Sequence, residues 1–122
     1  MSAIIRKSLD TPEESRPVKD GMGHVDIVTL ETGTVGRTTF LPGWRWSQHV
    51  KPIAGTDSCL MGHAGYTVSG RLKVVMDDGE EMEFGPGDVG VIPPGHDAWV
   101  LGEEPYVFVD WQGLADYAKP AG

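Results

Sequence analysis

The residues of this sequence best suited to bind a metal ion are three histidines and a cysteine, namely His49, His63, His96 and Cys59. Imidazole nitrogens coordinate first-row transition metals at ~2.0–2.1 Å, so the protein ligands of one ion lie within a few ångströms of each other. The three histidines fall on, or at the edges of, three separate predicted strands, and side chains on strands ~4.8 Å apart can converge on one ion. A divalent metal site is therefore the leading hypothesis. A histidine that only packs or hydrogen-bonds is the alternative at each position, most of all at His49.

Cys59 precedes His63 by four residues, and the two can share a metal only if the chain between them bends. On a straight strand four residues span ~13 Å, which is too far for two ligands of one ion. The continuous run from Leu60 onward favours the straight strand, with Cys59 as a small buried residue. A bend at Gly55 or Gly62 is the alternative. It would give a mixed sulfur and nitrogen site that favours zinc or copper over manganese.

Short apolar runs recur along most of the chain, separated by turn-forming pairs such as Asp78-Gly79. Together with 17 glycines and 9 prolines, this pattern predicts an all-β sandwich or barrel. A stiff corner at Pro94-Gly95 separates two of the strands and presents His96, and we expect Trp99 and Trp111 to pack between sheets. The expected strands are 25–31, 35–41, 44–50, 60–69, 72–76, 81–84, 89–92, 98–101 and 106–111, and the expected helical turns lie within 10–19 and 114–118.

Composition and charge restrict the function classes. The 122-residue chain has a formal net charge of −8 and no basic stripe, which argues against binding nucleic acid or an anionic membrane. No apolar run approaches a membrane span, the N-terminus lacks the pattern of a signal peptide, and a single cysteine excludes an internal disulfide framework. We therefore expect a cytoplasmic protein with one domain: an N-terminal arm over 1–24, a barrel over 25–113 and a C-terminal tail over 114–122.

One segment resembles the second sequence motif of the cupins, a family of small double-stranded β-barrels of the jelly-roll type. It begins with Gly87-Asp88 and ends with Pro93-Pro94-Gly95. The resemblance covers about residues 35–112. It implies an all-β cupin double-stranded β-barrel (jelly roll) with a short N-terminal arm.

A second likeness, to the first cupin motif, implies the ligands of the metal. Gly43 and His49 have the spacing of that motif's glycine and first histidine, and His63 stands in the place of its glutamate. Lys51 replaces the motif's second histidine, and His96 comes two residues earlier than the histidine of the second motif. The resemblance implies one divalent transition metal (Zn, Fe, Ni, Cu or Mn) bound by the three histidines.

In this interpretation the protein is a metal-dependent cupin that acts on, or binds, a small polar metabolite with a carboxylate or carbonyl group. The metal would polarise that group, or bind O₂ beside the substrate. Cupins include dioxygenases, isomerases and lyases, so the resemblance does not fix the reaction. Because no Glu or Asp obviously faces the metal, it stays open whether the protein is an enzyme. A non-catalytic ligand sensor and a metal-free barrel are the alternatives.

Three polar side chains are candidates for the substrate pocket. Arg37 and Thr39 alternate on one predicted strand, and an inward Arg37 would bind a carboxylate, whereas a solvated Arg37 is an equal alternative. Arg45 shares a face of its predicted strand with His49 and would lie at the mouth of the barrel. Asp97 follows His96, so strand alternation turns it to the other face, where a structural hydrogen bond is expected.

The N-terminal arm is the expected dimerisation element. The segment Ala3-Ile4-Ile5 cannot bury its apolar side chains locally, and an open barrel edge needs covering. Many cupins dimerise through such an arm, so the resemblance and the residues agree on a homodimer.

Overall fold

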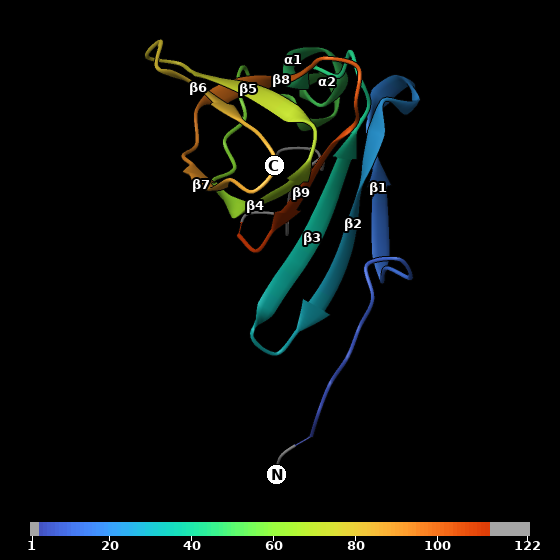
Figure 1. Ribbon diagram of the computed structural model, residues 1–122. Helices are drawn as coiled ribbons and strands as arrows, with labels where there is room; N and C mark the ends of the chain where they lie inside the picture. Colours follow the sequence, from blue (N-terminus) through green and yellow to red (C-terminus); the bar gives the residue numbers. More distant parts are fainter. Residues whose placement is uncertain (1–2, 113–122) are drawn as a thin grey trace.

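The computed structural model describes residues 3–112, whose strands form two sheets that face each other across a hydrophobic core (Figure 1). The larger sheet has six strands in the order β1-β2-β3-β9-β4-β7, and the smaller has three in the order β6-β5-β8. The strands are β1 (Glu14–Pro17), β2 (Gly23–Leu30), β3 (Gly33–Phe40), β4 (His63–Ser69), β5 (Arg71–Met76), β6 (Glu81–Phe84), β7 (Val89–Ile92), β8 (His96–Leu101) and β9 (Tyr106–Asp110). All these pairings are antiparallel. The predicted all-β, double-stranded barrel is confirmed.

The corner at Pro94-Gly95 carries the chain from the larger sheet to the smaller one, as the sequence predicts. β7 ends at Ile92 and β8 begins at His96. Gly95 has a φ of 93°, a conformation in which a side chain would be strained. Its N–H donates to the carbonyl oxygen of Cys59 at 2.7 Å, so the corner is fixed to the segment that precedes β4.

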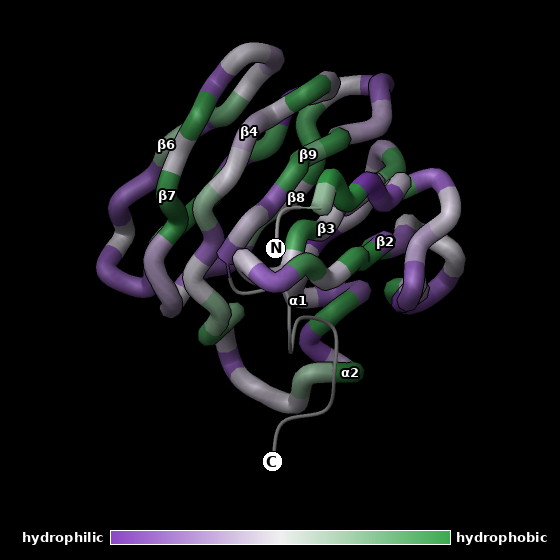
Figure 2. The backbone as a smooth tube through the Cα atoms, turned by 90° about the horizontal axis from the view of Figure 1, so that it is seen from below, coloured by the Kyte–Doolittle hydropathy of each residue, from purple (hydrophilic) through white to green (hydrophobic). Residues whose placement is uncertain are grey.

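The segment predicted as a strand over 44–50 forms two short helices, α1 (Trp46–His49) and α2 (Lys51–Ala54), that lie together at one end of the barrel (Figures 1 and 2). The first turn of α1 is stabilised by Asp97, whose carboxylate accepts the N–H of Ser47 at 3.1 Å. α2 ends at Gly55, whose φ of 78° suits glycine. The acceptor that stabilises α1 comes from a distant strand, which explains why the local sequence did not reveal the helix.

The N-terminal end of the barrel differs from the predicted boundary. β1 pairs with β2 and lies where a helical turn was expected within 10–19, so the larger sheet begins inside the predicted arm over 1–24. A short 3-10 helix, η1 (Lys19–Gly21), connects these two strands. The predicted tail over 114–122, with its helical turn at 114–118, lies outside the described residues. Among residues 3–112, no helix is long and apolar enough to cross a membrane.

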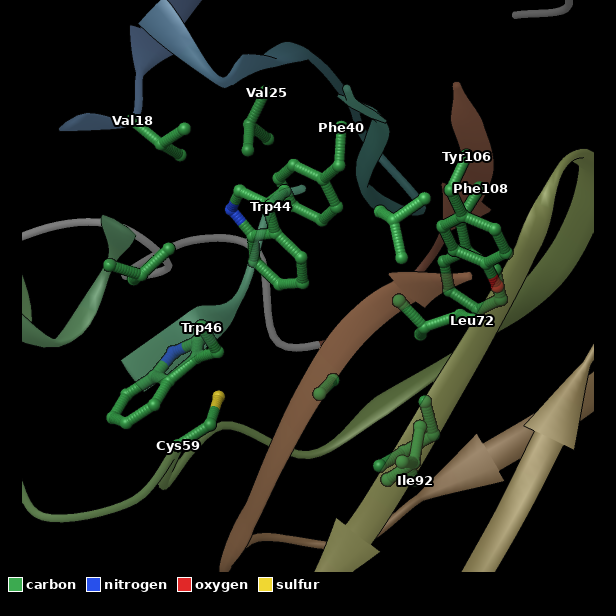
Figure 3. Close-up of a cluster of buried hydrophobic side chains, with 14 of the residues drawn as sticks. Val18, Val25, Phe40, Trp44, Trp46, Cys59, Leu72, Ile92, Tyr106 and Phe108 are labelled. Atoms are coloured by element: carbon green, nitrogen blue, oxygen red, sulfur yellow. The ribbon is translucent and has the colours of Figure 1, made fainter. Parts of the chain in front are cut away.

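The core is built around Trp44 and Trp46, each 2% exposed, and not around Trp99 and Trp111 as expected. Trp44 stacks on Phe40 with ring centroids 3.8 Å apart (Figure 3). Trp111 is 51% exposed. Trp99 alternates with the buried residues of β8 and therefore faces away from the core.

Candidate metal centre

The structure brings Cys59, His63 and His96 together, with ligands that come from both sheets. All three residues are buried, and their ligand atoms lie within 4.8 Å of one another. Sγ of Cys59 is 3.6 Å from Nε2 of His63. Two ligands of a tetrahedral zinc ion, a sulfur at ~2.3 Å and a nitrogen at ~2.0–2.1 Å from the metal, stand about 3.6 Å apart. The spacing therefore suits a metal site with mixed sulfur and nitrogen ligands.

Cys59 reaches His63 because the chain bends before β4, which corrects the straight strand favoured by the sequence. β4 starts at His63 and not at Leu60. Cys59 forms a backbone bridge with His96, in which its N–H donates to the His96 carbonyl oxygen at 2.8 Å. This bridge holds Cys59 at the edge of β8, while His63 belongs to the larger sheet. The two ligands therefore reach the centre from different strands, and their sequence separation says nothing about their distance.

Both histidines present Nε2 to the centre because their Nδ1 atoms are engaged elsewhere. Nδ1 of His63 is 2.7 Å from Oδ2 of Asp110, and Nδ1 of His96 is 2.8 Å from the carbonyl oxygen of Pro93. When Nδ1–H donates to these acceptors, the neutral imidazole carries its lone pair on Nε2, which is the nitrogen that can bind a metal. A carboxylate or carbonyl behind each histidine is the common arrangement around protein-bound metals. The donor set and its orientation thus fit a divalent transition metal.

Asp110 is a residue of the site that the sequence analysis missed. It is 1% exposed and lies at the end of β9, the strand between β3 and β4. Its register partners on those two strands are Gly36 and Gly65, and glycines leave room beside a neighbouring side chain. The sequence did indicate an inward Asp110. It ends an apolar strand two residues after Phe108, so the two side chains face the same side, toward the core.

Hydrogen bonds among these groups shift their pKa values. Burial alone would raise the pKa of the Cys59 thiol, but hydrogen bonds with His63 and His96 outweigh burial and lower the pKa to about 6. Burial alone would lower the pKa of His63, whereas its hydrogen bonds with Asp110 and Cys59 raise the pKa to about 9. Near neutral pH the metal-free pair is therefore a thiolate beside an imidazolium. The thiolate is the form of cysteine that binds metals.

The structure places His49 outside this group of ligand atoms. His49 is the last residue of α1 and is 8% exposed. Its Nδ1 accepts the backbone N–H of Arg45 at 3.0 Å, a bond within the helical turn. The prediction of His49 as a ligand rested on its motif spacing from Gly43 and on a strand over 44–50, and a helix replaces that strand. Cys59 takes the third place in the cluster.

A cavity of about 40 Å³ adjoins His63 and His96. Its wall consists mainly of aromatic and aliphatic side chains from both sheets, several of which are drawn in Figure 3. They include Phe40, Trp44, Leu72, Ile92, Tyr106 and Phe108. Asp110 and Thr38 also line it. The cavity is therefore a small apolar chamber beside the candidate ligands.

The predicted pocket residues Arg37, Thr39 and Arg45 do not line this cavity. Thr38 is an inward, buried residue of β3, so alternation turns Arg37 and Thr39 to the outer face of the sheet. There Arg37 pairs with Asp10 at 3.0 Å. The pocket role required an inward Arg37, whereas the structure has the other alternative, an outward Arg37, because a shift of one residue moves every side chain of a strand to the opposite face.

Arg45 is held outside the cavity by two residues of β8. Its Nε is 3.3 Å from Oδ2 of Asp97, and its guanidinium group lies 4.3 Å above the centroid of the Trp99 ring. Asp97 thereby joins Arg45 to the N–H of Ser47. The predicted structural role of Asp97 is confirmed, and the predicted pocket role of Arg45 is replaced by a structural one.

Comparison with known proteins agrees with this architecture. Residues 57–110, which include Cys59, His63 and His96, match the EutQ-like cupin domain. No curated protein matches the sequence significantly. Among solved structures, an uncharacterized conserved protein with a double-stranded beta-helix domain from Klebsiella pneumoniae has a TM-score of 0.57 and 26% sequence identity. That match covers 94% of each chain.

Two further structures share the fold. A protein of unknown function from Rhizobium leguminosarum has a TM-score of 0.60 and 19% identity, over 91% of this chain and 99% of that chain. The oxalate decarboxylase of Lactobacillus farciminis, solved as a formate complex, has a TM-score of 0.59 and 23% identity, over 84% of this chain and 32% of that chain. At these identities the similarity concerns the fold. The domain match and the shared double-stranded barrel support a cupin family for this chain.

Proposed function

We propose that this protein is a metal-dependent cupin whose divalent ion is bound by Cys59, His63 and His96. The observation that carries the proposal is the convergence of three buried ligand atoms within 4.8 Å. Both imidazoles are already oriented for coordination by acceptors at Nδ1. A cluster that served packing alone would not require both histidines to point the same ring nitrogen at one thiol.

The donor set favours zinc among the metals that the sequence left open. One thiolate and two imidazoles suit zinc or copper better than manganese, which prefers oxygen ligands. Among the described residues, the cluster contains no fourth His, Cys, Asp or Glu. Three protein ligands leave a fourth position for water or a small molecule, as in catalytic zinc sites.

A small molecule at that fourth position is the expected substrate or ligand. A bound divalent ion would polarise its oxygen atom, as metals do in carbonyl chemistry. Asp110 behind His63 orients this metal-binding histidine. An apolar wall lines the cavity beside the open metal position. An isomerase or lyase acting on a carbonyl compound fits a zinc site of this kind. A dioxygenase would need a redox-active metal such as iron or copper on the same ligands.

A ligand sensor is the second candidate, because the acid–base groups at the cavity are already engaged. The two oxygens of Asp110 accept hydrogen bonds from His63 and from the N–H of Gln112. The hydroxyl of Tyr106 is 2.7 Å from that of Thr67. Turnover assays of the zinc-loaded protein with small aldehydes and ketones separate the two candidates, since binding without turnover would favour the sensor.

Metal analysis of the purified protein and its variants tests the site. We expect one ion per chain in the wild type, and loss of most of it in Cys59→Ser, His63→Ala and His96→Ala, because two remaining ligands make a weak site. His24→Ala is the matched control, since His24 pairs with Asp26 at 3.2 Å and has a half-exposed side chain. A wild type that carries no metal, and takes up none of Zn, Ni, Mn or Fe on titration, would refute the proposal.

We also propose that the protein is a homodimer. Ile4 is 100% exposed and Ile5 is 66% exposed, so the arm buries neither side chain against its own chain. The outer face of β4 and β7 exposes Tyr66, Val89 and Val91. Figure 2 shows hydrophobic residues along β7. Contiguous apolar patches on soluble proteins usually mark interaction sites. A second copy would bury both surfaces.

A further inference from the structure

The geometry points to a small, uncharged carbonyl compound with an apolar body, an aldehyde or a ketone, as the ligand of the fourth metal position, and excludes a carboxylate. The inference rests on the proposed metal site and names the class of molecule that this site would take. It separates the two ligand chemistries, carboxylate and carbonyl, that the sequence left open.

The charge of the site is balanced before any ligand enters. A divalent ion would contribute two positive charges, and the metal-bound thiolate of Cys59 contributes one negative charge. The carboxylate of Asp110, which is 1% exposed and 2.7 Å from His63, contributes the other. The two imidazoles bind metals as neutral groups. A carboxylate ligand would add an uncompensated negative charge to a buried site, which is costly, whereas a carbonyl oxygen leaves the balance unchanged.

Within the part of the chain that the structure describes, no lysine or arginine lines the cavity. Arg37 and Arg45, which the sequence suggested for this role, pair with Asp26 and Asp97 on other surfaces. Carboxylate recognition typically uses a guanidinium group in a bidentate arrangement. Here those groups lie elsewhere and are already paired, so among the described residues no cationic side chain is placed to recognise a carboxylate in the cavity.

The polar groups on the cavity wall have partners within the protein. The hydroxyl of Thr38 donates to the carbonyl oxygen of Phe108 at 3.4 Å, and the hydroxyl of Tyr106 is 2.7 Å from that of Thr67. Both oxygens of Asp110 are hydrogen-bonded as well. A ligand with several hydroxyl groups would bury them without partners, which costs free energy for each. The body of the ligand must therefore be apolar, like the rest of the wall.

The cavity also limits the size of the ligand. Its volume of about 40 Å³ exceeds the ~10–15 Å³ that one water needs and is well below the ~150 Å³ of a cavity that binds benzene. Acetone falls within this range. Acetate has the same number of non-hydrogen atoms and nearly the same shape, so the two molecules differ mainly in charge.

Titration of the cobalt-substituted protein with acetone and with acetate tests the inference, because the visible absorption of Co(II) reports a change at its open position. At fixed pH and ionic strength we expect acetone to change the spectrum saturably, at roughly a tenth of the acetate concentration or less. Acetate that binds as tightly as acetone would overturn the inference and leave the metal site intact. A wild type that fails to bind one Co(II) per chain would instead refute the proposed function, and the inference with it.

A second measurement locates the ligand in this cavity. Leu72 lines the cavity and is 5% exposed, so Leu72→Ala enlarges the chamber. Leu60 is 53% exposed and does not line it, which makes Leu60→Ala the matched control. We expect cyclopentanone to bind the cobalt form of Leu72→Ala roughly tenfold more tightly than the wild type or the control. Leu72→Val is the milder variant if the alanine does not fold. An equal response of all proteins would overturn the assignment to this cavity.

Discussion

Replacing Asp110 with Asn should weaken metal binding strongly without removing a ligand. Asparagine has nearly the same shape and can still accept the N–H of Gln112, but it loses the charge that faces Nδ1 of His63 at 2.7 Å. Carboxylates behind metal-binding histidines are worth about 10–100-fold in metal affinity, or about 1.4–2.8 kcal/mol. Asp110 is 1% exposed, so water cannot replace the lost charge. We therefore expect the upper part of this range.

Competition with a chromophoric zinc chelator measures the Kd of the wild type and of Asp110→Asn. Asp97→Asn is the matched control, because Asp97 bonds to Arg45 and Ser47 outside the centre, and its zinc Kd should equal that of the wild type. Circular dichroism verifies that each variant is folded. A folded Asp110→Asn with wild-type zinc affinity would refute the reasoning that Asp110 orients His63 at a metal centre.

Three further predictions concern packing, surface charge and assembly. Gly65→Ala should lower the free energy of unfolding by about 1–3 kcal/mol, because its Cβ would overlap the carbonyl oxygen of Val109. Gly62→Ala is the control, since a Cβ at Gly62 would have an ordinary nearest contact of 3.5 Å. Equal urea midpoints for the two variants would contradict this packing. Arg45→Ala should lower the free energy of unfolding by no more than about 1 kcal/mol, since the Arg45 side chain is 42% exposed. The zinc content should not change, and a loss of zinc would show that Arg45 contributes to the metal site. Val91→Glu places a charge on the outer face of β7, so light scattering should show a monomer in place of the dimer. A wild type that is monomeric well above micromolar concentration would argue against the homodimer.

The features that the sequence predicted correctly are those with a local physical cause. The corner at Pro94-Gly95 was predictable because proline and glycine restrict the backbone wherever they occur, and the structure places it between β7 and β8. The hairpin at Asp78-Gly79 follows from the same kind of signal. His63 and His96 were predicted from their residue type, their strands and the resemblance to the cupin motifs; the structure brings them together, and their role as metal ligands stays a prediction.

The errors concern features determined by distant parts of the chain. The helix over Trp46–His49 depends on Asp97 for its first-turn acceptor, so the expected strand does not form and His49 lies outside the cluster. Cys59 joins the cluster through a backbone bridge with His96, which no spacing of four residues could reveal. The parity of β3 was ambiguous because Thr38 and Thr39 are the same residue type, and only the packing of the second sheet decides which faces inward.

X-ray absorption spectroscopy of the zinc-loaded protein tests the central claim most directly, because it counts sulfur and nitrogen ligands at the metal. We expect one zinc per chain with one sulfur at ~2.3 Å and nitrogens at ~2.0–2.1 Å. The sulfur signal should disappear in Cys59→Ser. Stoichiometric zinc with only nitrogen and oxygen neighbours in the wild type would contradict the account, because it would place the metal away from Cys59.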